Sequence, residues 1–320
     1  MFRSFFIYLS KAAWARKLVT RWSVAWKAAS RFVAGETLAD AIRVAKDLNQ
    51  KGMNVTLDHL GEHTNTPEEA SQAARHVLDI LDEIDRMGVR ANVSIKLTQI
   101  GLALGYEVCE KNLATILTRA QEHGTFIRID MEDSPWVDVT LGLYREMAAR
   151  FGGETVGIVI QSYLYRSEQD VQELAEMQAR VRLCKGAYKE PANIAFPKKV
   201  DVDASYDHLV EMLINTSLQA GSPGLSPDGK IPPIPGIASH DEVRIERAKA
   251  YAAKTGLHKH ALEFQMLFGI RRDLQGQLVA NGYPVRVYVP YGTEWYPYFM
   301  RRLAERPANL WFFISNYFRR

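Results

Sequence analysis

Short runs of apolar and β-branched residues alternate along the chain with longer segments in which apolar residues recur every three or four positions. The runs predict strands at residues 53–58, 92–97, 126–132, 156–161, 180–186, 234–239, 260–265 and 285–290. The longer segments have the period of amphipathic helices, as in 67–87, 201–220 and 241–255. This alternation predicts parallel strands joined by crossover helices, and eight strand–helix pairs are the number that closes an α/β barrel.

Helix and loop signals agree with this reading. Thr66 is placed to cap the helix 67–87, with Pro67 at its first position and an acid three residues after the cap. The Pro/Gly-rich segment 221–236 reads as one long loop before the sixth strand. We therefore predict one distorted (β/α)8 TIM barrel. The predicted division is a helical extension over residues 1–48, the barrel over 49–310 and a tail over 311–320.

Residues 291–309, YGTEWYPYFMRRLAERPAN, predict a helix with an unusual face. Tyr298, Arg301, Arg302 and Glu305 fall at i, i+3, i+4 and i+7, the spacing that normally carries the buried apolar stripe. A hydroxyl, two guanidinium groups and a carboxylate on this face indicate that it meets a polar ligand.

The net charge of the chain says little about its binding partners, but the charge of the N-terminal segment is unusual. The formal charge of the 320-residue chain is +3, too small to indicate nucleic acid. Residues 1–35 carry seven basic and no acidic residues. They read as basic helices beside a domain, as a mitochondrial-type presequence or as a surface-lying amphipathic helix, and no run is long enough to span a membrane. The two cysteines, without a CxxC motif, fit a reducing compartment, and we expect a cytoplasmic protein.

Polar residues gather near the carboxyl ends of the predicted strands, where the chemistry of such barrels takes place. In chain order they are Asp58, Glu62, Lys96, Asp130, Glu132, Gln161, Arg182, Lys185, His240, Gln265 and Tyr288. A charge in a buried strand is costly unless it is paired, so one such residue could be a structural ion pair. Polar groups at the end of nearly every strand instead predict a functional site.

The motifs leave two kinds of site open. The sequence has no GxGxxG after the first strand, no P-loop and no GxSxG. The segment DHLGEH (58–63) is a weak metal candidate, and a metal-dependent barrel hydrolase using Asp58, His59, His63 and His240 is the alternative. Basic residues favour an anionic ligand instead, since arginine binds carboxylate and phosphate in a bidentate manner. These are Lys96, Arg182, Lys185, Arg301 and Arg302.

Seven segments resemble the proline dehydrogenase family, in that family's order and over roughly residues 50–310. They are SIKLTQIG (94–101), RIDMEDS (128–134), VIQSYL (159–164), VRLCKGAYKEP (181–191), ASHDE (238–242), EFQMLFGIR (263–271) and YVPYGTEWYPYFMRRLAERPAN (288–309). The combination of RLCKGAY with YxxRRLxE is highly specific. Since no aldehyde dehydrogenase or DNA-binding segment flanks these motifs, the chain resembles the stand-alone bacterial type.

The resemblance implies a distorted barrel that carries FAD and oxidises L-proline to 1-pyrroline-5-carboxylate, the first step of proline degradation to glutamate. It implies hydride transfer to flavin N5, with the electrons passed on to a quinone. A quinone acceptor leaves open a peripheral contact of the N-terminal helices with the inner membrane. We expect neither a metal nor nucleic acid, and the oligomeric state stays open.

The resemblance also assigns substrate residues. Arg301 and Arg302 match the arginines that hold the proline carboxylate, and Asp130 and Arg182 match the pair usually given catalytic roles. Whether Asp130 is a base or only orients a donor stays open. The other substrate positions match Lys96, Leu267, Tyr288 and Tyr298. Glu62 matches the acid that pairs with Arg301 and closes the site.

Flavin contacts of the family carry over in the same way. They match Met131, Gln161, Arg182, Lys185, Gly186, Ala187, Ser239 and His240. The basic groups of Lys96 and Arg182 should favour the anionic reduced flavin. Two positions depart from the family: Ser239 stands where threonine is usual, and Asp241 where asparagine is common. Both keep a polar group, so FAD binding is still expected.

Overall fold

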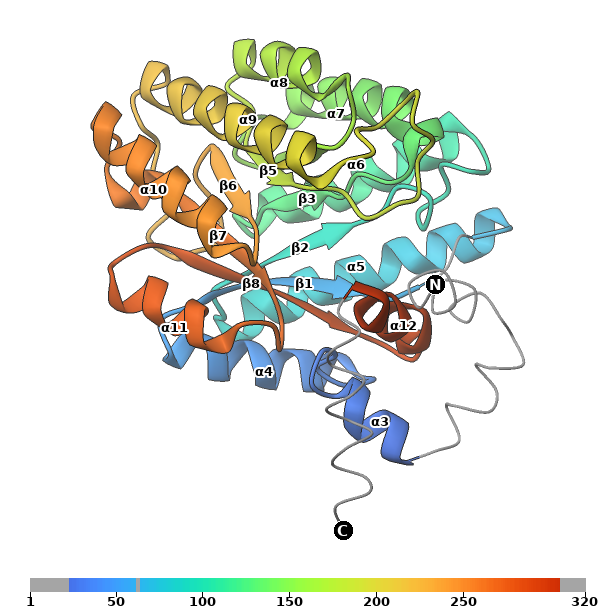
Figure 1. Cartoon of the computed structure of the whole chain (residues 1–320). Helices are drawn as coiled ribbons and strands as arrows, with labels where there is room; N and C mark the ends of the chain where they lie inside the picture. The colour runs from blue at the N-terminus through green and yellow to red at the C-terminus, as the bar shows by residue number, and fades with distance from the viewer. Residues whose placement is uncertain (1–22, 62–63, 306–320) are drawn as a thin grey trace.

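The strands close into one parallel barrel in which each strand pairs with the next and β8 pairs back with β1. The structure, a computed structural model, describes residues 23–61 and 64–305 (Figure 1). The strands are β1 (Asn54–His59), β2 (Ala91–Ile95), β3 (Ile127–Ile129), β4 (Val156–Gln161), β5 (Val181–Cys184), β6 (Pro235–Ala238), β7 (Glu263–Leu267) and β8 (Val285–Tyr291). The predicted (β/α)8 barrel is confirmed, and every predicted strand overlaps an observed one.

Helices connect the strands, and most of them form the outer ring (Figure 1). They are α3 (Ser23–Ala29), α4 (Leu38–Gln50), α5 (Pro67–Met87), α6 (Tyr106–Glu122), α7 (Val137–Phe151), α8 (Ser167–Glu176), α9 (Lys199–Gln219), α10 (Glu242–Thr255), α11 (Arg272–Ala280) and α12 (Trp295–Glu305). Two 3-10 turns, η1 (Ser134–Trp136) and η2 (Lys259–Ala261), precede α7 and β7. The helix predicted over 67–87 has the bounds of α5, and those over 201–220 and 241–255 differ from α9 and α10 only at their ends.

The start of α5 shows the predicted cap with one change. The hydroxyl of Thr66 accepts a hydrogen bond from the backbone N–H of Glu69 at 3.2 Å, and Pro67 is the first helical residue. The Glu69 carboxylate accepts from the backbone of Asn65 at 2.7 Å rather than from Thr66. The reciprocal bond of the capping box is therefore shifted by one residue.

The strands are buried on both faces, as a parallel barrel surrounded by helices requires. All six residues of β4 are buried, and so are the five of β2. Among the described residues, no helix has the length and apolar character needed to cross a bilayer.

The last helix does not join the outer ring, and this is the distortion of the barrel. In a regular barrel the helix after β8 packs beside β8 and β1, but here α4 contacts these two strands. Figure 1 shows α12 beyond the carboxyl ends of β1 and β8. It is held there by a small second core with α3, in which the rings of Trp26 and Trp295 lie 5.3 Å apart and Phe32 and Phe299 lie 6.3 Å apart. The polar face of α12 therefore belongs to the end of the barrel where the site was predicted.

The insert 221–236 lies at the opposite, amino-terminal end of the barrel. The carbonyl of Gly229 accepts from Arg286 Nη2 at 2.7 Å, and the carbonyl of Lys230 accepts from Asn92 Nδ2 at 3.0 Å. Arg286 and Asn92 are the second residues of β8 and β2. A loop that leads from a helix into a strand ends at this face, so the insert closes the barrel from below the site.

Candidate active site

Arg182 on β5 connects several strands at the carboxyl end of the barrel. Its side chain is buried, with 7% exposed. Nε donates to Gln265 Oε1 on β7 at 2.6 Å, and Nη1 donates to Ser94 Oγ on β2 at 3.1 Å and to Asp130 Oδ1 at 2.9 Å. The planar guanidinium group uses separate N–H groups for these bonds, so its orientation is fixed.

Asp130 follows β3 and is surrounded by donors. It accepts from Ser94 Oγ at 2.6 Å, from Arg182 and from the hydroxyl of Tyr288 at 2.8 Å, while Lys96 Nζ lies 3.6 Å from Oδ2. Burial alone would raise the pKa of Asp130, but the charges of Lys96 and Arg182 outweigh it and hold the pKa below its ordinary value. The carboxylate is therefore ionised and fully engaged.

Lys96 lies between two acids. Its Nζ is 3.2 Å from Asp58 Oδ1 and 3.6 Å from Asp130 Oδ2. Burial acts to lower the pKa of Lys96, but Asp58 and Asp130 raise it above its ordinary value, so the side chain stays an ammonium ion. Burial and the charge of Asp130 also raise the pKa of Tyr288 well above its usual range, which keeps its hydroxyl a donor.

The strand ends differ slightly from the prediction. Lys96 and Asp130 were placed on strands but follow β2 and β3, which are shorter than expected. Gln265 was placed at the end of its strand but lies inside it, because β7 continues to Leu267. β2 and β3 end early because the chain leaves the sheet where side chains turn to the site. A pattern of apolar residues records neither this nor the continuation of β7.

The face of α12 supplies the arginine pair. Tyr298 is buried, and the Arg302 guanidinium lies 5.1 Å from the centre of its ring. Arg301 is exposed, and its side chain makes no hydrogen bond or ion pair with the rest of the described chain. Partial desolvation of the guanidinium group, together with the charge of Arg302, lowers the pKa of Arg301, while Tyr188 and Asp58 act in the opposite direction. Since Tyr188 and Asp58 act on Arg301, this face of α12 lies near the polar residues at the barrel end.

Tyr188 is a site residue that was not predicted. It is close enough to Lys96, Glu132 and Arg301 for their charges to act on it, and burial raises its pKa to about 12. The phenol thus lies near charged groups of both the barrel end and α12, although 38% of the residue is exposed. The sequence signal for Tyr188 is its place in the CKGAY segment (184–188), next to Lys185, Gly186 and Ala187.

Predicted flavin contacts at the ends of β4 and β6 already make hydrogen bonds within the protein. Gln161 Nε2 donates to the backbone carbonyl of Glu132 at 2.8 Å. Ser239 Oγ accepts from the backbone of Asp241 at 3.0 Å. His240 Nε2 accepts from the backbone N–H of Leu267 at 2.9 Å, so its proton is on Nδ1. Met131 is buried in the core below them.

The loop after β5 passes closely over Tyr163. Gly186 has φ +104°, and a Cβ there would lie 2.3 Å from the Tyr163 ring, so only glycine fits. The Tyr163 hydroxyl is buried and has no hydrogen-bond partner in the described part of the chain. The neighbouring Ala187 is exposed. Small residues beside an unsatisfied polar atom suit a bound group that is both flat and polar.

Lys185, predicted as a cation that contacts a phosphate group, is paired with two acids in this structure. Its Nζ lies 2.5 Å from Asp203 Oδ1 and 2.8 Å from Asp241 Oδ2. Lys199 also contacts both acids. Lys185 is therefore neutralised here, and a phosphate would compete with these carboxylates.

The residues of the metal alternative are not assembled as a site. Asp58 is paired with Lys96, and the His59 ring lies 4.9 Å from that of His76 and 5.1 Å from that of Tyr291. Among residues 23–61 and 64–305, no three His, Cys, Asp or Glu side chains gather as metal ligands. His63, and Glu62 as the predicted closing acid, lie outside the described residues. This arrangement does not favour the hydrolase.

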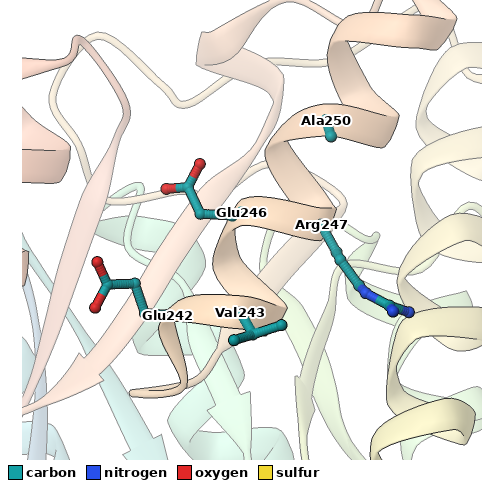
Figure 2. A pocket seen from close by; sticks show the side chains of 5 residues that line it. All are labelled: Glu242, Val243, Glu246, Arg247 and Ala250. Atoms are coloured by element: carbon teal, nitrogen blue, oxygen red, sulfur yellow. The ribbon is translucent and has the colours of Figure 1, made fainter.

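A hollow on the outer ring is separate from this site. Figure 2 shows its lining, which comes from one face of α10: Glu242, Val243, Glu246, Arg247 and Ala250. It contains none of the predicted site residues. The candidate active site is therefore the polar centre at the carboxyl ends of the strands.

The chain is similar to known proteins in sequence and in fold. A family model described as proline dehydrogenase matches residues 41–314. Proline dehydrogenase of Deinococcus radiodurans is 42% identical over 293 residues, which cover 91% of this chain and 90% of that protein. Proline dehydrogenase 2 of Bacillus subtilis (strain 168) is 37% identical over 311 residues, 97% of this chain and 96% of that one.

Longer relatives match over part of their length. The bifunctional protein PutA of Escherichia coli (strain K12) is 27% identical over 323 residues, 87% of this chain but 23% of PutA. The crystal structure of proline utilization A from Bdellovibrio bacteriovorus, inactivated by N-propargylglycine, is similar with a TM-score of 0.78 and 26% identity. That match covers 88% of this chain and 33% of the longer protein.

A buried polar centre at the carboxyl ends of parallel barrel strands is typical of α/β-barrel enzymes, and the fold and the matches make this chain one of them. It belongs to the proline dehydrogenase family, because the family model covers most of the chain and relatives with 37% and 42% identity match nearly all of it. Members of this family are oxidoreductases.

Proposed function

We propose that this chain oxidises L-proline to 1-pyrroline-5-carboxylate with bound FAD as the electron acceptor, in the first step of proline degradation. The observation that carries the proposal is the contrast between two arginines. The charge of Arg182 is met by Asp130 at 2.9 Å, whereas Arg301 has no ion-pair partner among the described residues. An arginine left without an acid on the face above a polar centre is suited to the carboxylate of a small substrate.

The substrate would lie between α12 and the ends of the strands. Arg301 and Arg302 hold its carboxylate, while Tyr288, Tyr298 and Leu267 pack against its ring. Because proline is small, its contact area offers little binding free energy, and the paired arginines supply affinity and orientation. Glu62 remains our proposal for the acid that closes the site.

FAD would be held along the ends of β3 to β6. The residues are Met131, Gln161, Arg182, Lys185, Gly186, Ala187, Ser239 and His240. When bound, the flavin supplies a two-electron acceptor that takes up a hydride from the substrate at N5. The close passage of Gly186 over Tyr163 and the unsatisfied Tyr163 hydroxyl support this fit. Lys185 would exchange Asp203 and Asp241 for a phosphate group.

The polar centre would orient the reactants and set the local charge. The ring nitrogen of proline must be neutral when the hydride leaves, since its lone pair stabilises the developing iminium. Asp130 is already engaged by its neighbours, which supports an orienting role rather than that of a free base. The positive charges of Lys96 and Arg182 favour an anionic reduced cofactor.

A quinone is our proposal for the final acceptor, with a peripheral membrane contact through the N-terminal segment. A truncation that tests this contact should remove residues 1–22 only, because Phe32 and Val33 belong to the small core that holds α12. Equal liposome binding by the full and truncated proteins would refute the contact.

Turnover tests the main proposal. Purified protein is incubated with L-proline and a soluble quinone, and the products are followed by mass spectrometry. We expect loss of two hydrogens from L-proline, equimolar reduction of the quinone and no reaction with D-proline. Flavin-loaded protein that leaves L-proline unchanged would refute the proposal.

A further inference from the structure

A chain of buried hydrogen bonds runs inside the barrel from its amino-terminal end to the active site. It begins at the carbonyl of Gly229, which accepts from Arg286 Nη2 at 2.7 Å. Arg286 Nε donates to Glu263 Oε1 at 2.8 Å, and Gln265 Nε2 donates to the same oxygen at 2.7 Å. Gln265 Oε1 then accepts from Arg182 Nε at 2.6 Å. All four side chains are at least nine-tenths buried.

The amide of Gln265 can adopt only one orientation in this chain. Its oxygen faces the guanidinium of Arg182, and its NH2 group faces the carboxylate of Glu263. A flipped amide would place donor against donor and acceptor against acceptor. The bonds that are made hold these side chains in place, because the low dielectric makes breaking one of them costly. The second oxygen of the acid, Glu263 Oε2, is buried and has no hydrogen-bond partner in the described part of the chain.

The barrel wall leaves a space for this amide. Gly236 on β6 pairs in register with Arg182 on one side and with Glu263 on the other. A Cβ on Gly236 would lie 2.7 Å from Gln265 Nε2 and 3.1 Å from its Cδ. The missing side chain at Gly236 therefore provides the room in which Gln265 reaches between Glu263 and Arg182.

We infer that Gln265 is a positioning residue for Arg182, supported by Glu263 and Arg286 and by the space at Gly236. Because Nε is held by Gln265, the far side of the guanidinium group is directed at Asp130 and Ser94. Apart from the place of Gln265 among the polar residues at the strand ends, none of these four residues has been given a role in the site. The inference rests on the proposed function, since it concerns the arginine that we place beside FAD and substrate.

Two changes disturb this contact in different ways. Gln265→Leu removes both hydrogen bonds of the amide. Gly236→Ala leaves all polar groups in place but pushes the amide away from its position. In both variants we expect kcat for L-proline to fall about tenfold or more, the effect of losing about one bond of a charged group. KM should change much less, because the carboxylate is held by Arg301 and Arg302.

Matched controls separate positioning from stability. Thr155→Val removes a buried hydrogen bond to Phe151 just before β4. Gly276→Ala adds a methyl group on α11 where, apart from the adjoining backbone of the helix, no atom lies within 4 Å. The decisive readout is the reduction potential of the bound flavin, which should shift to lower values when Arg182 is displaced and stay unchanged in the controls. Wild-type protein without flavin or turnover would refute the proposed function, and the inference with it.

A different result would refute the role of Gln265 while leaving the proposed function intact. If the wild type is active and Gln265→Leu and Gly236→Ala match the controls in kcat and flavin potential, differing only in melting temperature, Gln265 is merely structural. If Gln265→Leu does not fold, Gly236→Ala decides the question, since it removes no polar group. A lowered kcat with a lowered potential in Gly236→Ala supports positioning.

Discussion

The hydroxyl of Tyr288 on β8 donates a 2.8 Å hydrogen bond to Asp130 Oδ2, across the end of the barrel from β3. The other oxygen of Asp130 accepts from Arg182 and Ser94. One carboxylate thus connects β2, β3, β5 and β8, and its orientation depends on all of them. The predictions below begin from this arrangement.

Tyr288→Phe should lower kcat/KM for L-proline by about tenfold or more, because a hydrogen bond to a charged group contributes roughly 1.5–3 kcal/mol. The phenol stays protonated at working pH, so the loss should not depend on pH between 6 and about 9. Steady-state kinetics over this range measure it. Tyr251→Phe is the control, since its hydroxyl bonds to Asn215 on the outer ring. Equal kinetics of both variants would contradict the role of Tyr288.

The two arginines of α12 should behave differently. Arg301→Ala should raise KM for L-proline by about thirtyfold or more, in line with the roughly 2–5 kcal/mol lost when one partner of a charged pair is removed. It should leave the melting temperature unchanged, because Arg301 has no partner among the described residues. Arg302→Ala should raise KM and also lower the melting temperature, since Arg302 packs on Tyr298.

A substrate analogue without a carboxylate tests whether Arg301 acts on that group. Pyrrolidine, which lacks the carboxylate, should bind wild-type protein and Arg301→Ala with similar weak affinity. Calorimetry or competition against L-proline measures this. An Arg301→Ala variant that loses pyrrolidine as strongly as L-proline would show that Arg301 does not act on the carboxylate.

Acid should weaken the fold through Asp130. Its pKa is lowered in the folded protein, so its contribution to stability is complete above its ordinary value of 3.8 and is lost as the pH falls below it. Asp130→Asn should cost about 3–5 kcal/mol at pH 7, because Lys96 and Arg182 lose their shared acid. The free energy of unfolding of the wild type and of Asp130→Asn, measured at pH 7 and at pH 3, tests both statements. The difference in this free energy between wild type and Asp130→Asn should be smaller at pH 3 than at pH 7. A difference that does not depend on pH would contradict the ionised state of Asp130.

Asp241→Asn should strengthen the retention of FAD. Asp241 pairs with Lys185 at 2.8 Å and also caps α10 through the backbone of Val243. Asparagine caps a helix equally well but carries no charge, so Lys185 becomes available to a phosphate. Cofactor dissociation measured by fluorescence on dilution should be slower in the variant. Unchanged or faster dissociation would remove Lys185 from the proposed phosphate contacts.

The barrel itself could be predicted from the sequence because strand and helix periods alternate without interruption from β1 to β8. The ends of strands were less certain, as at Lys96 and Asp130, because the chain leaves the sheet at the site. The place of α12 could not be read from its pattern alone. That place depends on a small core with α3, in which Trp26 meets Trp295.

The sequence predicted which polar residues lie at the carboxyl end of the barrel, but not the residues with which they pair. Arg182 and Asp130 were named together, and the structure brings them to 2.9 Å. The partners of Lys185 were missed because Asp203 is on α9 and Asp241 precedes α10, and a spacing pattern does not show which acids meet across the ring. Gln265 was recognised as polar, but its contact with Glu263 depends on the space left by Gly236.

The most direct test of the central claim is the visible spectrum of the purified protein, followed without oxygen as L-proline is added. We predict a flavin band that bleaches with L-proline, and an Arg301→Ala variant that needs far more L-proline for the same change. A colourless protein that takes up no added FAD, or a flavin band that L-proline leaves unchanged, would contradict the account.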